Sequence, residues 1–406
     1  MHVVFVEPAF PRNQTEFVRA LAEVGARVTA VGEAPVEALP GKLKGWLHGY
    51  EQVPSVVHRP SLEGAVRGIQ EREWVDRLEG TVEAHMMPIA EVREACGIPG
   101  TSVRTTFLCR DKPAMKEALR EAGIATAQST GARSAEEVRE FAAREGYPLI
   151  LKPSAAAGAA GTYRVDDDEQ LEEAIRASQV DHGVPTAVEE FVEGHEAFYD
   201  TLTAGGEVVH EFISHYYPNV LEAMRKRWIS PQIITTNRLD AEAYEEVRRL
   251  GKRVIEVLGI ETSATHMEWF FGPKGLRFSE IACRPPGVMV WDFYGAANGL
   301  DLYVEWAKIV TVGRTEARAS REYSGGMIAL RPDRDGTIVG YEGVEEIERR
   351  FGEHILDMHL PPPGTPTQGV EGGYMANAYI RLRHPDYDEL RRIMDTIGET
   401  VKVRAR

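Results

Sequence analysis

The chain has 406 residues, 43% of them hydrophobic, and a formal net charge of −16. Its length exceeds that of one ordinary domain and, at roughly 150 residues per domain, favours two or three. An acidic chain lacks the basic footprint that nucleic acids require and is repelled by anionic membranes, so neither is expected as a partner. With no basic and apolar leader, no long apolar run and three cysteines without metal-ligand spacing, the sequence predicts a cytoplasmic protein with reduced thiols.

The first residues predict an α/β domain. Residues 2–6 (HVVFV) form an apolar run typical of a buried parallel strand. A helical stripe of Phe17, Leu21 and Val24 follows, Gly25 ends it, and residues 26–31 predict a second strand. This β-α-β order indicates a Rossmann-like parallel sheet with helices over residues 1–105. No G-x-G-x-x-G turn follows the first strand, so dinucleotide binding is not supported there.

A smaller unit is predicted over residues 106–192. Its expected elements are a helix at 111–122, a strand at 147–153, a helix around 169–177 and a strand at 188–192.

The remaining residues, 193–406, predict a larger α+β unit. Its expected elements are hairpin strands at 198–202 and 207–213, a helix at 242–258, hairpin strands at 264–271 and 276–281, a helix at 302–311, a Pro-rich surface loop at 360–364 and strands that resume at 374–382.

Lys152 ends an apolar strand and precedes a Gly/Ala-rich segment. A lysine in this place is costly to bury unless it meets an anion, and small residues let backbone N–H groups approach a phosphate closely. The pattern therefore predicts a phosphate-binding lysine with a flexible lid, in which Ser154, Gly158 and Gly161 are candidate contacts. A surface lysine before an ordinary loop is the alternative. No G-K-[ST] follows the glycines, so the segment is not a P-loop.

The segment VEEFVEGHE, residues 188–196, is the candidate nucleotide-recognition strand. An exposed strand edge can pair with the amide-like edge of adenine, and a carboxylate beyond it can accept hydrogen bonds from ribose hydroxyls. The candidate residues are Glu189, Glu190, Phe191 and Val192 along this strand and Glu196 beyond it. An acidic strand end with solvated carboxylates is the alternative.

The predicted hairpin at 264–284 concentrates polar side chains within aromatic surroundings. Strand side chains alternate faces, so His266 and Glu268 share one face, with Glu280 on the facing strand. Two such carboxylates form a hard oxygen site suited to Mg²⁺ or Mn²⁺ bound with nucleotide phosphates. Arg284 can hold an anionic substrate bidentately. The alternatives are a solvent-facing Glu–Arg pair and a structural, hydrogen-bonded histidine.

In order and spacing these motifs resemble the ATP-grasp superfamily, and within it the L-amino-acid ligases and other carboxylate–amine ligases. The resemblance runs from about residue 83 to 314, and the tail to residue 403 is compatible with it. It is carried by RDK at 110–112, GI at 123–124, PLILKP at 148–153, EEFV at 189–192, and Glu196, Glu268, Glu280 and Arg284.

The resemblance implies an ATP-grasp fold whose small unit is the lid, with ATP and Mg²⁺ as cofactors. Lys112 and Lys152 would then contact the ATP phosphates, and Glu268 and Glu280 would hold the metal. Arg284 would orient the substrate carboxylate and, with Lys152, act in catalysis. The substrate pocket would further include Glu83, His266 and Gly287.

One residue departs from the family pattern. Ala282 stands where many members carry an asparagine that ligates the metal, and some members resembling L-amino-acid ligases also lack it. The implied reaction joins a carboxylate, of an amino acid, to an amine through an acyl phosphate to give an amide or dipeptide, in a homodimeric enzyme. The alternatives are a carboxyphosphate-forming enzyme of the biotin carboxylase or purine-biosynthetic type, a non-catalytic nucleotide-binding module, and a chance match. The two substrates and the completion of the metal shell stay open.

Overall fold

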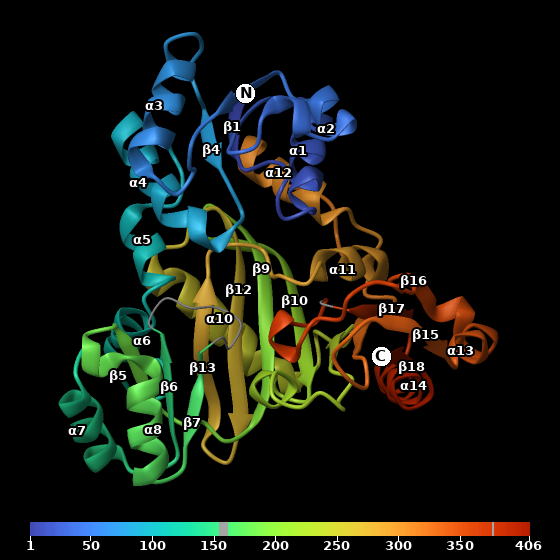
Figure 1. The fold of residues 1–406 in the computed structure, drawn as a ribbon. Coiled ribbons are helices and arrows are strands. Elements are labelled where there is room, and N and C mark those ends of the chain that lie inside the picture. Colours follow the sequence, from blue (N-terminus) through green and yellow to red (C-terminus); the bar gives the residue numbers. More distant parts are fainter. Residues whose placement is uncertain (154–160, 376) are drawn as a thin grey trace.

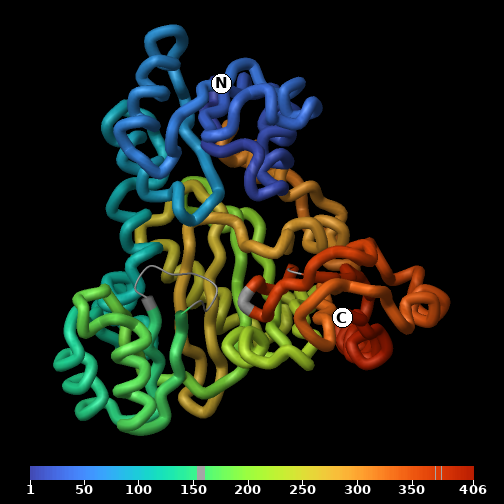
Figure 2. Tube along the Cα trace, viewed as in Figure 1, coloured from blue at the N-terminus to red at the C-terminus, as the bar shows by residue number. Residues whose placement is uncertain are grey.

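The computed structural model describes residues 1–153, 161–375 and 377–406 (Figure 1). Its strands form four sheets. In the trace of Figure 2 the chain descends from the N-terminal unit through helices to a small sheet and then returns to a large central sheet. None of the helices in the described ranges has the length and apolarity needed to cross a membrane.

The N-terminal sheet is parallel throughout, which confirms the predicted β-α-β opening. Its strand order is β3-β2-β1-β4. All five residues of β1 are buried, as a strand covered on both faces requires. The strands are β1 (His2–Val6), β2 (Arg27–Gly32), β3 (Gly49–Gln52) and β4 (Arg77–Glu79), and the helices are α1 (Gln14–Glu23), α2 (Gly41–Trp46), α3 (Arg59–Gln70) and α4 (Met86–Cys96).

A helix from the second half of the chain packs against this N-terminal unit. α12 (Leu302–Val312) lies beside α1 in Figure 1. The Phe17 ring centroid is 4.9 Å from that of Tyr303 and 5.0 Å from that of Trp306. The shared aromatic core fixes the N-terminal unit against the central sheet, because such buried rings dominate the packing energy of an interface.

The small sheet is antiparallel, with the order β5-β8-β6-β7. Leu149 and Leu151 enter its own core, whereas Ile150 and Lys152 face a cavity, as strand alternation requires. The strand predicted at 188–192 ends at residue 190: the Phe191 N–H still donates to the Pro148 carbonyl, but Pro148 has no N–H with which to return the bond. The elements are β5 (Ser129–Ala132), α7 (Ala135–Glu145), β6 (Leu149–Pro153), β7 (Tyr163–Val165), α8 (Asp168–Ser178) and β8 (Thr186–Glu190).

The central sheet has eight antiparallel strands in the order β13-β12-β9-β10-β11-β14-β17-β16. Both predicted hairpins are present, with longer strands than expected. The strands are β9 (His195–Ala204), β10 (Glu207–Tyr217), β11 (Gln232–Thr235), β12 (Ser263–Gly272), β13 (Gly275–Ala282), β14 (Ser324–Leu330), β16 (Ile355–His359) and β17 (Ala378–His384).

The remaining helices cover this sheet or connect it to the other units. The strand predicted from residue 374 begins only at residue 378, because residues 370–372 form a 3₁₀ helix and residues 374–375 a turn. These elements are α5 (Val103–Leu108), α6 (Lys112–Glu121), α9 (Val220–Ala223), α10 (Glu245–Leu258), α11 (Val290–Asn298), α13 (Val344–Phe351), α14 (Tyr387–Thr400) and the two-stranded pair β15 (Ile338–Glu342) and β18 (Lys402–Ala405).

Candidate active site

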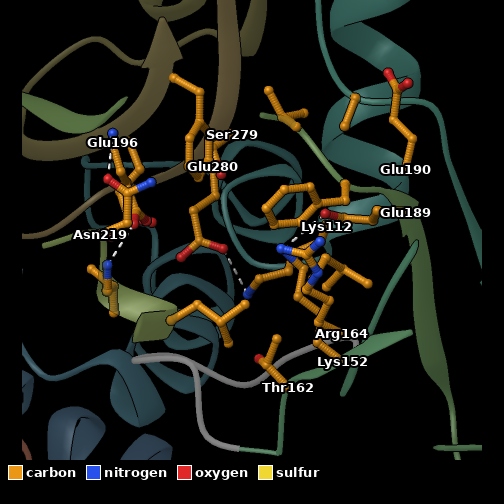
Figure 3. Close-up of a pocket in the computed structure, with 18 of the residues that line it drawn as sticks. Lys112, Lys152, Thr162, Arg164, Glu189, Glu190, Glu196, Asn219, Ser279 and Glu280 are labelled. Carbon is orange, nitrogen blue, oxygen red and sulfur yellow. Dashed lines mark hydrogen bonds and ion pairs between the residues drawn. The ribbon is translucent and has the colours of Figure 1, made fainter. Parts of the chain in front are cut away.

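A cavity of about 470 Å³ lies between the small sheet and the β12–β13 hairpin. Figure 3 shows charged side chains from both sheets pointing into this space. The volume is that of an ordinary small-molecule site. The lining includes Lys112 and Lys116 from α6, Ile150 and Lys152 from β6, Glu189 and Glu190 from β8, Glu196 from β9, Glu268 and Phe270 from β12, Phe278 and Glu280 from β13, and residues 219–222, 225 and 226 around α9.

Lys112 occupies the first position of α6. The preceding Asp111 caps this helix, since its carboxylate accepts a hydrogen bond from the Ala114 N–H at 3.0 Å. The cap fixes where the helix begins and therefore where the lysine lies. Lys112 Nζ is 3.2 Å from Glu280 Oε2, so residues from α6 and the hairpin meet across the cavity (Figure 3).

Glu189 is buried between two lysines. Its Oε1 is 2.6 Å from Lys116 Nζ, and its Oε2 is 3.0 Å from Lys152 Nζ. Burial raises the pKa of Glu189, but the two ammonium groups outweigh this effect and lower the pKa to about 2. Burial lowers the pKa of Lys116 to about 8 despite the attraction of Glu189. The predicted base-recognition residue Glu189 is therefore a carboxylate that anchors two cationic side chains.

Glu268 and Glu280 pair directly across the hairpin, next to a β-bulge at Glu268 and Trp269. Burial raises the pKa of Glu280, but Lys112 and Lys152 outweigh this effect and bring the pKa below its usual value, so the carboxylate is ionised. Hard carboxylate oxygens side by side suit Mg²⁺. No group of three or more acidic, His or Cys ligands is present in the described ranges, so phosphates and water would complete the shell. The residues present fit a metal that arrives with a nucleotide.

Glu196 lines the cavity. Its carboxylate accepts a hydrogen bond from the Val220 N–H at 2.6 Å, and its own N–H donates to the Asn219 side chain at 2.9 Å. Burial and the nearby Glu268 carboxylate raise the pKa of Glu196 to about 8. A largely protonated carboxyl at neutral pH can donate one hydrogen bond to a ligand and accept another.

Glu190, Phe191 and Val192 line the cavity, and the Arg164 guanidinium lies 4.3 Å from the Phe191 ring centroid. Ser154 and Gly158 lie outside the described residues. Gly161 has φ +67°, a conformation that glycine adopts without strain.

The residues predicted for the substrate lie outside the lining of this cavity, and the structure brings two of them into contact. Arg284 Nε donates to Glu83 Oε2 at 2.7 Å. His266 Nδ1 is 2.7 Å from Asp200, and its Nε2 is 3.6 Å from Glu268. Burial lowers the pKa of His266, but Asp200 and Glu268 raise it to about 9, so the Asp200–His266 pair is ionic.

The fourth substrate candidate, Gly287, has open space around it. A Cβ placed there meets no atom within 4 Å.

An ATP-grasp domain model matches residues 117–292. The chain is 27% identical over 304 residues to the L-arginine-specific L-amino acid ligase of Bacillus subtilis, which covers 70% of this chain and 69% of that protein. It is 26% identical over 225 residues to the alanine–anticapsin ligase of Bacillus subtilis strain 168, covering 49% of this chain and 46% of that relative. The match thus spans less than half of this second relative.

A solved structure agrees over the whole chain. The L-amino acid ligase from Bacillus licheniformis has a TM-score of 0.78 at 18% identity and covers 100% of this chain and 98% of that one. Residues 117–292 of the chain are an ATP-grasp domain. The predicted ATP-grasp fold is confirmed.

Sequence reasoning missed several residues that the ATP-grasp fold brings to this site. Lys116 is not among the predicted site residues, yet it is 1% exposed and paired with Glu189. Its position one turn after Lys112, on the face of α6 that carries Met115 and Leu119, was the available signal. Asp200 and Asn219 gave no such signal, because their partners His266 and Glu196 are set by strand register and loop closure.

Proposed function

We propose that this ATP-grasp enzyme uses ATP and Mg²⁺ to activate a carboxylate, that of an amino acid, as an acyl phosphate and joins it to an amine. One observation carries the proposal. The Glu268–Glu280 pair faces Lys112 and Lys152 in a single cavity, so oxygen ligands for a metal and cations for phosphates converge on one place. Phosphoryl transfer depends mainly on such positioning and charge neutralisation.

Glu268 and Glu280 would hold Mg²⁺, or Mn²⁺ in its place, with nucleotide phosphates as further ligands. A bound metal would neutralise charge that develops on the transferring phosphoryl oxygens. Lys112 lies beside Glu280 and would contact the same phosphates. Phe191, Val192 and the backbone of Glu190 would contact the base, with Glu196 close to the ribose.

In the first step a substrate carboxylate oxygen attacks the γ-phosphorus of ATP. A new O–P bond forms, the bond to the β-bridging oxygen breaks, and ADP leaves with that electron pair. Lys152 would turn from Glu189 towards the phosphates. Glu189 would keep Lys116 as its partner, so the move leaves no unpaired buried carboxylate.

In the second step the unprotonated amine nitrogen attacks the acyl carbon. The C–O bond to the phosphoryl group breaks, phosphate leaves, and the nitrogen loses a proton to give the amide. Arg284 would stabilise the tetrahedral oxyanion. The Arg284–Glu83 pair supports an amino acid as the acyl substrate, because adjacent opposite charges 2.7 Å apart complement a zwitterion.

The test is phosphate release from Mg-ATP across a matrix of amino acids and amines, with mass spectrometry of the products. A new amide mass together with ADP supports the proposal and identifies both substrates. Phosphate release that requires bicarbonate would replace it with the carboxyphosphate reaction. ATP binding with no turnover for any pair, with or without bicarbonate, would support the non-catalytic alternative.

A further inference from the structure

Arg331 follows β14 on the same face of the central sheet as the candidate active site. Met327 and Ala329, two and four residues earlier, pack in one core with Phe198 and Tyr216. Arg331 Nη1 donates to the backbone carbonyls of Ala223 and Lys226, the latter at 2.9 Å, next to α9. These bonds hold one side of the guanidinium in place.

The other side of the guanidinium is a buried fork without a partner. Nε and Nη2 of Arg331 are both covered and bond to no atom of the described residues. In an arginine these two groups point the same way and match the two oxygens of a carboxylate.

Two exposed arginines of this chain each hold a carboxylate through Nε and Nη2. Arg139 donates from Nε and Nη2 to the two Glu172 oxygens at 2.7 and 2.9 Å. Arg404 holds Glu342 in the same way at 2.9 and 2.7 Å. Of these three arginines, only Arg331 has a buried Nε–Nη2 edge, and this edge has no carboxylate partner among the described residues.

A second unsatisfied polar group belongs to the same region. The Tyr374 hydroxyl is buried and bonds to no atom that the structure describes. Burial lowers the pKa of Arg331, and the neighbours that act on its charge are Tyr374 and Arg227 rather than a carboxylate. A buried guanidinium without a counter-ion is costly, and a ligand oxyanion would remove that cost.

The fork adjoins the reaction centre without belonging to the nucleotide cavity. The Tyr374 ring centroid is 6.2 Å from that of Tyr216, whose hydroxyl donates to Glu268 Oε1 at 3.4 Å. Neither Arg331 nor Tyr374 lines the 470 Å³ cavity. That cavity already contains Lys112, Lys116 and Lys152 for phosphates, so the fork is left for a different oxyanion.

We propose that the Nε–Nη2 edge of Arg331, together with the Tyr374 hydroxyl, binds the carboxylate of the amine-bearing substrate. This substrate is therefore itself an amino acid, and the product is a dipeptide. The proposal rests on the proposed ligase function and deepens it by naming the residues that recognise the second substrate. A bidentate pair fixes orientation as well as affinity, so it would direct the amine towards the acyl carbon.

The experiment compares an amine with and without a carboxylate. With Mg-ATP and the acyl donor saturating, L-alanine and L-alaninamide are varied as amines, and the coupled products are quantified by mass spectrometry. The wild type is expected to prefer L-alanine in kcat/KM by about 10- to 100-fold, the value of charge-assisted hydrogen bonds. Arg331→Met is expected to abolish this preference through L-alanine alone, with KM for ATP unchanged. Arg139→Met, which removes an exposed fork, should behave as wild type.

Two further variants keep the proposal falsifiable if Arg331→Met unfolds after losing its bonds to α9. Arg331→Lys keeps the charge without the fork and should also lose the preference. Tyr374→Phe leaves the bonds to α9 intact and should reduce the preference by about 5-fold, one hydrogen bond.

Equal losses on L-alanine and L-alaninamide in folded variants would overturn the assignment. A raised KM for ATP would overturn it in favour of a phosphate. Absence of ADP release with any acid and amine in the wild type would overturn the proposed function first, before any variant is compared.

Discussion

Strands β9 and β10 carry buried polar clusters on both faces, and the two clusters are built differently. On the face of the candidate active site, His266 Nδ1 and Asp200 form an ion pair at 2.7 Å. On the same face the buried Glu280 carboxylate is kept ionised by Lys112 and Lys152. On the opposite face His195 Nε2 lies 2.9 Å from His215 Nδ1, and His215 Nε2 lies 2.8 Å from the Tyr244 hydroxyl. That second network is neutral, because burial lowers the pKa of both histidines.

The difference separates function from stability. Charges buried in pairs cost desolvation energy, and they can exchange partners when a charged ligand enters. Neutral hydrogen bonds cost less to bury and offer nothing to a phosphate. Substitutions on the two faces should therefore affect different measurements.

The largest effect is expected from Glu280→Gln. The amide keeps the shape but removes the negative charge that would hold a metal beside Lys112. Loss of metal stabilisation, worth several kcal/mol, should lower kcat by about 10³-fold and raise the Mg²⁺ concentration for half-maximal activity. ADP release at varied Mg²⁺ measures both. Glu207→Gln on the exposed start of β10 is the control, and activity of Glu280→Gln within a few-fold of wild type would exclude a metal role.

Lys152→Met should have the next largest effect. It removes a cation proposed to meet the transferring phosphate, so kcat should fall by about 10²-fold, as for loss of one transition-state donor. Glu189 retains Lys116, so the melting temperature should change little. Steady-state ADP release and thermal unfolding provide the two readouts, with the exposed Lys402→Met as control. A variant that loses stability but not kcat would assign Lys152 to the fold.

Lys116→Met tests the partner-exchange idea at smaller magnitude. Without Lys116, Glu189 depends on Lys152 alone, so Lys152 is held back from the phosphates. KM for ATP should rise by about 10-fold, equivalent to the loss of one charge-assisted bond, with a smaller change in kcat. Lys116→Arg keeps a cation for Glu189 and should restore most of the affinity. An unchanged KM for ATP in a folded Lys116→Met protein would contradict the exchange.

The sequence predicted those parts of the molecule that depend on local pattern. The run at residues 2–6, the helix that begins after Asp111 and the hairpin around residue 273 all follow from periodicity, capping and turn residues. The family resemblance implied one site for Lys112, Lys152, Glu268 and Glu280, and all four line one cavity. That Glu268 and Glu280 lie on facing strands followed from the hairpin pattern, but their direct pairing did not, because the regular register would place Ser279 opposite Glu268 and only the bulge beside Glu268 brings Glu280 there.

What the sequence could not predict is partner choice between distant segments. The sequence predicts Glu189 as a base contact but not its buried position between Lys116 and Lys152, which follows from how α6 packs against the small sheet. The contact of Arg284 with Glu83 joins residues 201 positions apart and depends on how the N-terminal unit sits on the central sheet. No period or local motif encodes such distances.

The smallest effect, and the one confined to stability, is expected from His215→Phe. Burial lowers the pKa of His215 to about 3, whereas in the unfolded chain it is about 6.5. The unfolded chain therefore binds one more proton between these values, and the free energy of unfolding of the wild type falls as pH drops through that window, by up to about 1.4 kcal/mol per pH unit. The variant should show a shallower slope in urea titrations from pH 7 to 4.

His215→Phe should also lose about 1–3 kcal/mol at pH 7.5, because the Tyr244 hydroxyl and His195 are left without their partner. Its kcat at pH 7.5 should stay close to that of the wild type, since the neutral network lies on the face away from the cavity. His182→Gln, at an exposed histidine, should leave the slope unchanged. A large loss of kcat at wild-type stability would show that the two faces are coupled and would remove the distinction between them.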